Sequence, residues 1–444
     1  MRYVIIGNSA AGVNAGEEIR RKDKESEIII ISDEKDIAYS RCLISRFLDT
    51  RLPETQLYFK TKNFYRDFNI KPILGKRVAA IDTSGQSISL DNGERFSYDK
   101  LLLAIGSTPA RPKICGLDLE NVFNFYSLED MRKINKSLKN VKKAVIAGAG
   151  FAGLEAAYAL RKLGINVTVV ERCSQILPNQ FDYISSELIR EDLEGLGVEV
   201  ILNESLTSIN GCGKIESVTI GEDTDISCSM VIFATGVRPN TQLASDAGLS
   251  KGKGIFVDEF LKTSGQNIYA AGDCIEIEDI STGKRQVSAT WFNAVLQGKF
   301  SALNMLGIAK RYSGLVGIQN AVQFHRLGAI SFGMTQVTDD DLDYEVISHY
   351  QKDGKIYKKL VVKDDYLCGM IFVGDILKAG FYAALIRNKI NISDFKGKFL
   401  DPDFSHAYFK NENFDQISSY APVPSCWQDP QHWLTERSMC MGIR

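Results

Sequence analysis

The feature that most constrains this chain is a pattern that occurs twice: an apolar strand, a glycine-rich turn, a helix, a second apolar strand and an acidic residue. In the first copy, the strand Tyr3–Ile6 leads into the turn Gly7–Gly12. In the second copy, the strand Ala144–Ala147 leads into the turn Gly148–Gly153. This order is that of the dinucleotide-binding unit of a parallel α/β sheet. The sequence therefore predicts two dinucleotide sites.

A second strand and an acidic residue complete each copy. Ile28–Ile31 precedes Asp33 and Glu34, and Val167–Val170 precedes Glu171. The glycines allow the backbone to approach a pyrophosphate closely, and the helix N-terminus offers unpaired N–H groups and partial positive charge. The acid, about 20 residues after the turn, accepts hydrogen bonds from ribose hydroxyls.

The repetition is stronger evidence than either turn alone, because a single glycine turn can serve only tight packing. In the first copy Ser9 replaces the middle glycine, and a serine is small enough to keep the close approach. Each copy also closes with an apolar strand that stops in a turn of small residues. These closing turns are expected to face the dinucleotides and comprise Ala104, Ile105 and Gly106 in the first copy and Ala234, Thr235 and Gly236 in the second.

Composition and charge narrow the class of protein. The chain has 444 residues, of which 44% are hydrophobic and 24% charged, and its formal net charge is −2. The length suggests two to three domains, and the charge gives no support for binding to nucleic acid or to an anionic membrane. We find no signal-peptide pattern at the start and no apolar run long enough to span a bilayer. Nine scattered cysteines without a CxxC pair favour a cytoplasmic protein with reduced thiols, and argue against an intrinsic iron–sulfur cluster or zinc site.

A third segment makes the resemblance to a known family specific. Ile268–Ala271 leads into Gly272, Asp273 and Cys274. The order of two glycine turns, their two closing turns and this Gly-Asp-Cys resembles the pyridine nucleotide–disulfide oxidoreductase superfamily over roughly residues 1–385. The resemblance implies an α/β fold with two Rossmann-like domains, one for FAD and one for NAD, followed by a small α+β C-terminal domain and an extended tail. The expected boundaries are 1–112 and 245–318 for the FAD domain, 113–244 for the NAD(P) domain, 319–398 for the C-terminal domain and 399–444 for the tail.

The resemblance also implies which turn holds which cofactor. FAD would lie on the first turn and reach Asp273, which in the family bonds to the ribitol, and the nicotinamide dinucleotide would lie on the second turn with Glu155 near the nicotinamide and the flavin. The implied FAD contacts are Gly7, Ser9, Ala10, Ala11, Gly12, Asp33, Glu34, Arg41, Cys42, Val78, Ala104, Ile105, Gly106, Gly272, Asp273 and Phe292. The implied NAD contacts are Gly148, Gly150, Phe151, Ala152, Gly153, Glu155, Glu171, Arg172, Ala234, Thr235 and Gly236.

The acid of the second copy bears on the choice between NADH and NADPH. A carboxylate at Glu171 suits a free ribose 2′-hydroxyl and repels a 2′-phosphate. The neighbouring Arg172 could soften this repulsion. We therefore expect NADH, with NADPH less favoured.

The segment Ala38–Arg46 bears on the electron acceptor. Cys42 stands where relatives with a single redox cysteine carry it, and a thiolate beside the flavin could attack a disulfide. The residues after Cys42 differ from the Cys-Gly or Cys-Ala and Leu-Pro of those relatives, and Ala10 stands where the oxidase and peroxidase branch has a histidine. The segment is more similar to the Tyr-Ser-Arg-Pro-Leu motif of NADH:rubredoxin reductases and of flavin subunits that serve iron–sulfur partners, with Cys42 at the proline position.

Three functions stay open at this point. The first is an FAD-dependent NAD(P)H oxidoreductase that passes electrons between NADH and a rubredoxin- or ferredoxin-like iron–sulfur protein. The second is a thiol–disulfide reductase for CoA disulfide, persulfide or polysulfide, with Cys42 as its redox residue. The third is a flavin subunit of a larger iron–sulfur redox complex. The aromatic tail is a candidate partner or subunit contact, and the sequence leaves the acceptor, the direction of electron flow and the oligomeric state, a homodimer included, undecided.

Overall fold

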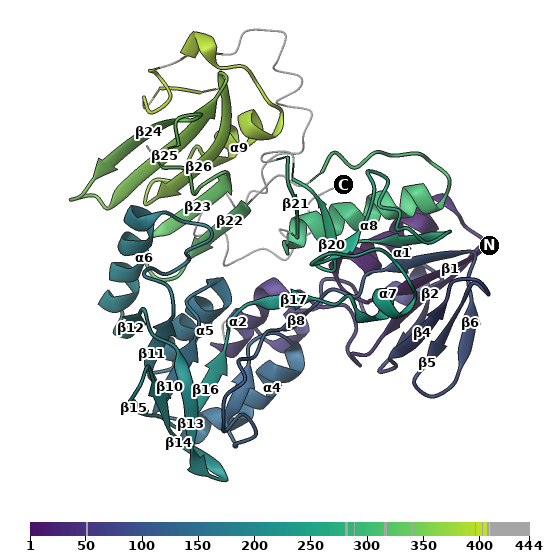
Figure 1. Ribbon diagram of the computed structural model, residues 1–444, viewed down its shortest axis with the longest axis horizontal. Helices are drawn as coiled ribbons and strands as arrows, with labels where there is room; N and C mark the ends of the chain where they lie inside the picture. Colours follow the sequence, from purple (N-terminus) through teal and green to yellow (C-terminus); the bar gives the residue numbers. More distant parts are fainter. Residues whose placement is uncertain are drawn as a thin grey trace. The chain divides into compact units, whose positions relative to one another are not determined.

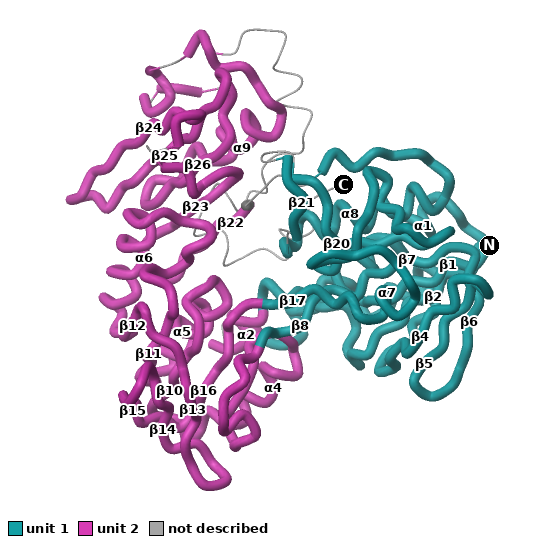
Figure 2. The backbone as a smooth tube through the Cα atoms, viewed as in Figure 1, with its two compact units in different colours: residues 1–43, 53–110, 237–315 teal, residues 44–52, 111–236, 316–444 magenta. Residues whose placement is uncertain are grey.

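The computed structural model describes residues 1–49, 52–279, 283–287, 289–314, 318–338, 341–395, 397–401, 403–405 and 408. The chain forms two compact units, and each is assembled from segments that are far apart in the sequence (Figure 2). Unit 1 comprises residues 1–43, 53–110 and 237–315, and unit 2 comprises residues 44–52, 111–236 and the described residues after 317.

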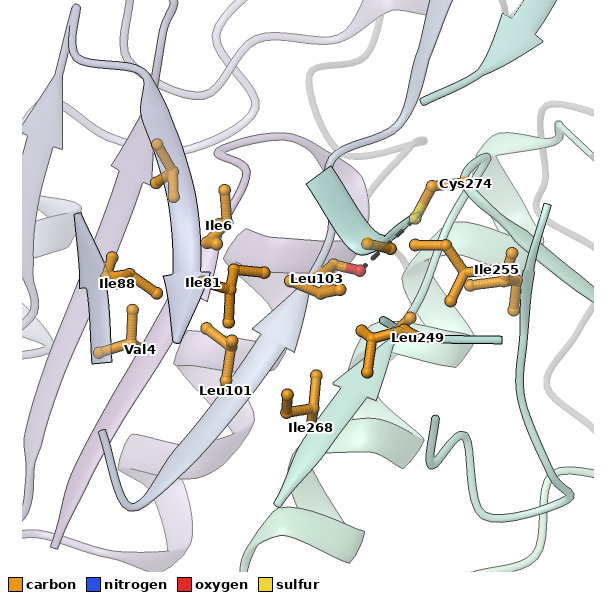
Figure 3. Packing of buried hydrophobic residues seen from close by; sticks show 14 of the residues in the cluster. Val4, Ile6, Ile81, Ile88, Leu101, Leu103, Leu249, Ile255, Ile268 and Cys274 are labelled. Atoms are coloured by element: carbon orange, nitrogen blue, oxygen red, sulfur yellow. Dashed lines mark hydrogen bonds between the residues drawn. The ribbon is translucent and has the colours of Figure 1, made fainter. Parts of the chain in front are cut away.

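A parallel sheet of five strands forms the centre of unit 1, in the order β19–β7–β1–β2–β3. Figure 1 labels its neighbouring strands β1 and β2. Its strands are β1 (Arg2–Ile6), β2 (Glu27–Ser32), β3 (Lys71–Leu74), β7 (Lys100–Leu103) and β19 (Ile268–Ala270). The near-continuous apolar runs of β1 and β2 are typical of parallel strands covered on both faces. On one face, Val4, Ile6, Leu101, Leu103 and Ile268 pack with Ile81, Ile88, Leu249 and Ile255 (Figure 3).

Two long helices pack on each other in unit 1. They are α1 (Ala10–Lys22) and α8 (Trp291–Met305). A Cβ atom at Gly298 would lie 2.2 Å from the carbonyl oxygen of Ala11, so the two backbones approach closely at this glycine. The smaller elements of unit 1 are α3 (Phe64–Asp67), α7 (Gln242–Asp246), β4 (Val78–Asp82), β5 (Ser87–Leu90), β6 (Arg95–Ser97), β8 (Ser107–Pro109), β17 (Val237–Pro239), β18 (Ile255–Phe256), β20 (Ile275–Glu278) and β21 (Arg285–Gln286).

Unit 2 contains a second parallel sheet, in the order β12–β11–β10–β16–β9. Its strands are β9 (Val122–Asn124), β10 (Lys143–Ala147), β11 (Asn166–Glu171), β12 (Val198–Leu202) and β16 (Met230–Phe233). The accompanying elements are the helices α2 (Ile44–Leu48), α4 (Leu128–Ser137), α5 (Phe151–Lys162) and α6 (Tyr183–Gly195) and the antiparallel strands β13 (Leu206–Cys212), β14 (Lys214–Ile220) and β15 (Thr224–Ser227). The predicted α/β class with two Rossmann-like sheets is confirmed.

An antiparallel sheet with one helix completes unit 2. The sheet has the order β22–β23–β26–β25–β24, and the helix is α9 (Ala379–Arg387). Its strands are β22 (Ile318–Gln323), β23 (Gly328–Gly333), β24 (Glu345–Gln351), β25 (Ile356–Lys363) and β26 (Tyr366–Val373). Phe399 and Phe404, from the segment assigned to the tail, are buried in the core of this sheet and helix. Trp427 and Trp433 lie outside the described residues, and the domain boundaries stay a prediction.

None of the helices among the described residues is both long enough and apolar enough to cross a membrane.

Candidate functional site

The carboxyl ends of three neighbouring parallel strands meet at one edge of the sheet in unit 1. β1 ends before Gly7, β7 ends before Ala104, and β19 is followed by Gly272 and Asp273. The register pairs Ile6 with Leu103 and Leu103 with Ala270, so these turns lie side by side. Ligands of open parallel sheets bind at the carboxyl ends of the strands. The fold therefore brings together three turns that the sequence marked separately.

The first glycine turn leaves no room for a side chain at Gly7 or Gly12. Gly7 has a φ of +122°, and a Cβ there would lie 2.0 Å from the carbonyl oxygen of Ala104. A Cβ at Gly12 would lie 2.0 Å from the carbonyl oxygen of Gly7. Ser9 is the N-cap of α1, and within the described residues its side chain makes no capping hydrogen bond. The N–H groups that open α1 are thus placed to receive a phosphate.

The acids after β2 lie in different surroundings. Glu34 forms an ion pair with Arg41, whose guanidinium lies 5.3 Å from the ring centroid of Tyr39. Asp33 is exposed. Glu34 and Arg41 together offer an acceptor for a ribose hydroxyl and a cation for a phosphate, so Glu34 fits the predicted ribose contact better than Asp33 does.

Asp273 is a half-buried carboxyl group at the same sheet edge. The hydroxyl of Ser107 donates to Asp273 Oδ2 at 3.2 Å. Loss of solvent raises the pKa of Asp273, and the Ser107 hydrogen bond and the charge of Arg41 oppose this rise only in part. The N–H of Gly272 donates to Gln297 Oε1 at 2.8 Å, which ties the strand end to α8. A carboxyl with acceptor capacity at this position fits a polyhydroxyl chain such as ribitol.

The other residues predicted to contact FAD are also placed in unit 1, in varied surroundings. Ala10 and Ala11 are buried in the first turn of α1. Val78 is buried in β4, and Phe292, at the start of α8, is 39% exposed. Cys42 is exposed in the short 3₁₀ helix Arg41–Leu43. An exposed thiol can meet an external disulfide, which a buried one cannot.

The second glycine turn repeats this geometry in unit 2. Gly148 has a φ of +103°, and a Cβ there would lie 2.6 Å from the carbonyl oxygen of Ala234. A Cβ at Gly153 would lie 2.0 Å from the carbonyl oxygen of Gly148. Gly150 is the N-cap of α5, and among the described residues no atom beyond its own chain neighbours lies within 4 Å of the position of its missing Cβ. The start of α5 is therefore open on the side where a pyrophosphate would bind.

Glu171 is the buried acid of the second copy, with 8% of its surface exposed. Glu171 Oε2 accepts the backbone N–H of Ala149 at 2.7 Å, and Oε1 accepts that of Cys173 at 3.0 Å. These bonds fix the carboxylate beside the glycine turn, as ribose binding requires. Loss of solvent, together with the Glu171 carboxylate, raises the pKa of the Cys173 thiol, so Cys173 is poorly suited to act as a nucleophile.

The remaining predicted contacts in unit 2 lie at the ends of the same strands or on α5. Phe151 and Glu155 are half-buried on α5, and Ala152 is exposed. Arg172 and Thr235 are exposed at the ends of β11 and β16. The sequence prediction did not include Ser107 and Gln297, which donate to Asp273 and accept from Gly272, respectively. The hydroxyl of Ser107, directly after the first closing turn, was the available signal, whereas the contact of Gln297 depends on the packing of α8.

Among the residues that the structure describes, no group of three histidine, cysteine, aspartate or glutamate side chains is arranged to hold a metal ion.

Comparison with known proteins agrees with this geometry. Residues 1–298 match the pyridine nucleotide-disulphide oxidoreductase family, and residues 323–390 match the rubredoxin NAD+ reductase C-terminal domain. The chain is 37% identical over 348 residues to an NADH oxidase from Methanocaldococcus jannaschii, covering 76% of each chain. It is 30% identical over 364 residues to a rubredoxin-NAD(+) reductase from Ectopseudomonas oleovorans, covering 79% of this chain and 94% of the relative.

A solved structure and two longer relatives complete the comparison. The structure of a NAD-dependent persulfide reductase from A. fulgidus superposes with a TM-score of 0.83 at 28% identity, covering 89% of this chain and 78% of the other. The chain spans about half the length of two Bacillus subtilis relatives, 52% of an assimilatory nitrate reductase electron transfer subunit and 48% of a nitrite reductase. The chain belongs to the pyridine nucleotide-disulphide oxidoreductase family, whose members are FAD-dependent enzymes that exchange electrons with NADH.

Proposed function

We propose that this protein passes electrons between NADH and a small iron–sulfur protein of the rubredoxin or ferredoxin type. The observation that carries the proposal is the match of residues 323–390 to the C-terminal domain of rubredoxin NAD+ reductases. The segment Tyr39–Leu43, which is more similar to the motif of carrier reductases than to that of disulfide reductases, gives independent support.

The residues of the chain would bind and orient the two cofactors. Bound FAD couples the two-electron chemistry of NADH to the one-electron chemistry of an iron–sulfur carrier. The first glycine turn would hold the FAD pyrophosphate at the N-terminus of α1, and Glu34 would hold its ribose. Asp273 would accept a ribitol hydroxyl. Glu171 would accept the ribose hydroxyls of NADH and disfavour the 2′-phosphate of NADPH.

A second candidate function uses Cys42 as a redox thiol. The exposure of Cys42 and its place beside Arg41 favour this reading, because a neighbouring cation stabilises a thiolate. The thiolate would attack a disulfide, release one thiol and form a mixed disulfide, and two electrons from NADH would then release the second thiol. Residues 323–390 and the Leu43 that follows the cysteine support the first proposal instead.

The test is anaerobic reduction of the FAD-loaded protein by NADH, followed by addition of one acceptor at a time. Oxidised rubredoxin, a ferredoxin, a CoA disulfide and oxygen are compared, for the wild type and for Cys42→Ser. Cys212→Ser, at another exposed cysteine, is the matched control. We expect fast bleaching of rubredoxin or ferredoxin, with the Cys42→Ser rate within about twofold of the wild-type rate.

Other acceptors would contradict the proposal. Fast reduction of a disulfide that is lost in Cys42→Ser and kept in Cys212→Ser would support the thiol–disulfide reductase instead. Reduction by NADH without transfer to any acceptor, restored by an associated iron–sulfur subunit, would support a flavin subunit of a larger complex.

A further inference from the structure

The segment 175–182, between β11 and α6, contacts the second glycine turn. The N–H of Leu177 donates to the carbonyl oxygen of Ala149 at 3.0 Å, which joins the segment to the turn itself. Phe181 is fully buried, and its ring packs edge-on against Phe151 at the start of α5, with the centroids 6.3 Å apart. Gln175 Nε2 donates to the carbonyl oxygen of Phe181 at 2.8 Å and closes the segment on itself. The position of the glycine turn therefore depends on the position of residues 175–182.

The segment contains one residue, Leu177, in an unfavourable backbone conformation. Leu177 has a φ of +49°, in the left-handed region that a leucine avoids. A residue keeps such a conformation only while surrounding contacts hold it there. The contacts that hold the segment thus decide how often it has the shape that supports the glycine turn.

Several of these contacts come from the antiparallel C-terminal sheet of the same unit, and the central one is an ion pair between the buried Lys359 and the half-buried Asp182. Lys359, on β25, is 6% exposed at its side chain, and its Nζ lies 3.3 Å from Asp182 Oδ2. The same ammonium donates to the carbonyl oxygens of Thr335 at 3.2 Å and Val337 at 2.7 Å. Tyr357 Oη donates to Asp182 Oδ2 at 2.7 Å. One oxygen of Asp182 is therefore committed to the C-terminal sheet.

The other oxygen of Asp182 belongs to α6. Asp182 is the N-cap of this helix, and its Oδ1 accepts the N–H of Ser185 at 3.1 Å. From the segment that follows β23, Gln336 Nε2 also donates to the carbonyl oxygen of Phe181 at 3.1 Å. Residues 181 and 182 are thus held between α5, α6 and β25. Loss of Asp182 would leave the buried charge of Lys359 without its partner, so this contact favours one position of residue 182.

We propose that Lys359, through Asp182, is a positioning residue for the nicotinamide dinucleotide site. The inference rests on the proposed function of the second glycine turn and adds that a residue of the C-terminal sheet, with no contact to NADH, sets the affinity for NADH. Without the ammonium, Asp182 is no longer tied to β25 and the segment 175–182 samples other arrangements. NADH binding must then restore the arrangement of the segment that supports the second glycine turn.

The test compares two lysine variants in the FAD-loaded protein. Lys359→Met removes the buried charge, and Lys355→Met removes an exposed ion pair between Lys355, in the turn before β25, and Glu191 of α6. If the competent arrangement falls to about a tenth of the population, the Kd for NAD⁺ by calorimetry and the KM for NADH with ferricyanide rise about tenfold. The kcat at saturating NADH stays within about twofold, because bound NADH restores the arrangement. Lys355→Met leaves all three quantities unchanged.

A second variant, Asp182→Asn, keeps the proposal testable if Lys359→Met does not fold. Asp182→Asn keeps the Oδ1 acceptor for Ser185 but replaces Oδ2, which accepts from Tyr357 and pairs with Lys359, by an uncharged NH2 donor, so it should raise the Kd in the same direction. In the double variant with Lys359→Met, the fold-increase in Kd should be smaller than the product of the two single fold-increases, because both substitutions remove the same interaction.

The inference is overturned if folded Lys359→Met, or folded Asp182→Asn, binds NAD⁺ like the wild type, or if kcat falls while the Kd stays unchanged. Glu171→Ala separates this outcome from failure of the proposed site. If Glu171→Ala leaves the Kd for NAD⁺ unchanged, the second glycine turn is not the nicotinamide site, whatever Lys359 does.

Discussion

Gly7→Ala is expected to remove FAD and to destabilise unit 1. The new Cβ would lie 2.0 Å from the carbonyl oxygen of Ala104, so β1 and the turn after β7 must separate by about an ångström before it fits. Overpacking of this kind costs about 1–3 kcal/mol. A φ of +122° for an alanine costs roughly a further 1–3 kcal/mol.

The sum of about 2–6 kcal/mol is a large part of the 5–15 kcal/mol that typically stabilises a folded domain. For a unit of this size each kcal/mol lowers the melting temperature by about 2–4 °C, so we expect a fall of roughly 4–24 °C. The ratio of flavin absorbance to protein absorbance after purification, together with thermal unfolding, measures both effects.

Gly93→Ala is the matched control for backbone conformation. Gly93 has a φ of +88°, but no atom lies within 4 Å of the position of its missing Cβ. This variant should keep FAD and lose only about 1–2 kcal/mol. If Gly7→Ala retains FAD and melts with the wild type, the tight turn is not needed for the cofactor. If both variants lose equal stability, backbone strain rather than the close approach is the cause.

Two further predictions concern the acids of the two sites. Glu171→Ala should lower kcat/KM for NADH about 10–100-fold, because hydrogen bonds to a charged acceptor contribute about 1.5–3 kcal/mol, whereas kcat/KM for NADPH should hold or rise as the repulsion is removed; an unchanged NADH-to-NADPH ratio would contradict it. Burial raises the pKa of Asp273 above its ordinary value of 3.8, so the folded chain holds this proton more tightly than the unfolded chain, and the carboxylate costs stability increasingly as the pH rises above that value. Flavin-free Asp273→Asn should therefore melt above the wild type at neutral pH, with a gap that closes in acid, and should retain less FAD when loaded; a gap that widens in acid would refute the assignment.

The parts of the fold that follow from local sequence could be predicted. The strand, glycine turn, helix and acid of each copy lie within a short stretch, and hydrophobic period and turn chemistry are local signals. The structure places Gly7 and Gly148 at left-handed φ values with carbonyl oxygens directly behind them. The spacing of the acids was less decisive, because it did not distinguish Asp33 from Glu34.

The parts that depend on contacts between distant segments could not be predicted. Lys359 and Asp182 are far apart in the sequence, and nothing in either neighbourhood indicates that they meet. Phe399 and Phe404 show no helical or strand period, yet they fill the core between α9 and its sheet. Arg20, in the last turn of α1, is buried, and its guanidinium donates to four backbone carbonyls, among them that of Phe68.

The pairing of β19 with β7 has a consequence for biosynthesis. A nascent polypeptide released only as far as residue 267 has its first glycine turn but no Gly272 or Asp273. The parallel sheet of unit 2 is complete earlier, because its strands all lie between residues 122 and 233. Since domains fold during translation once their segments have emerged from the ribosome, the parallel sheet of unit 2 can form while that of unit 1 still lacks β19. If FAD binds at the first glycine turn and Asp273, as we propose, its capture is a late event in the maturation of this protein.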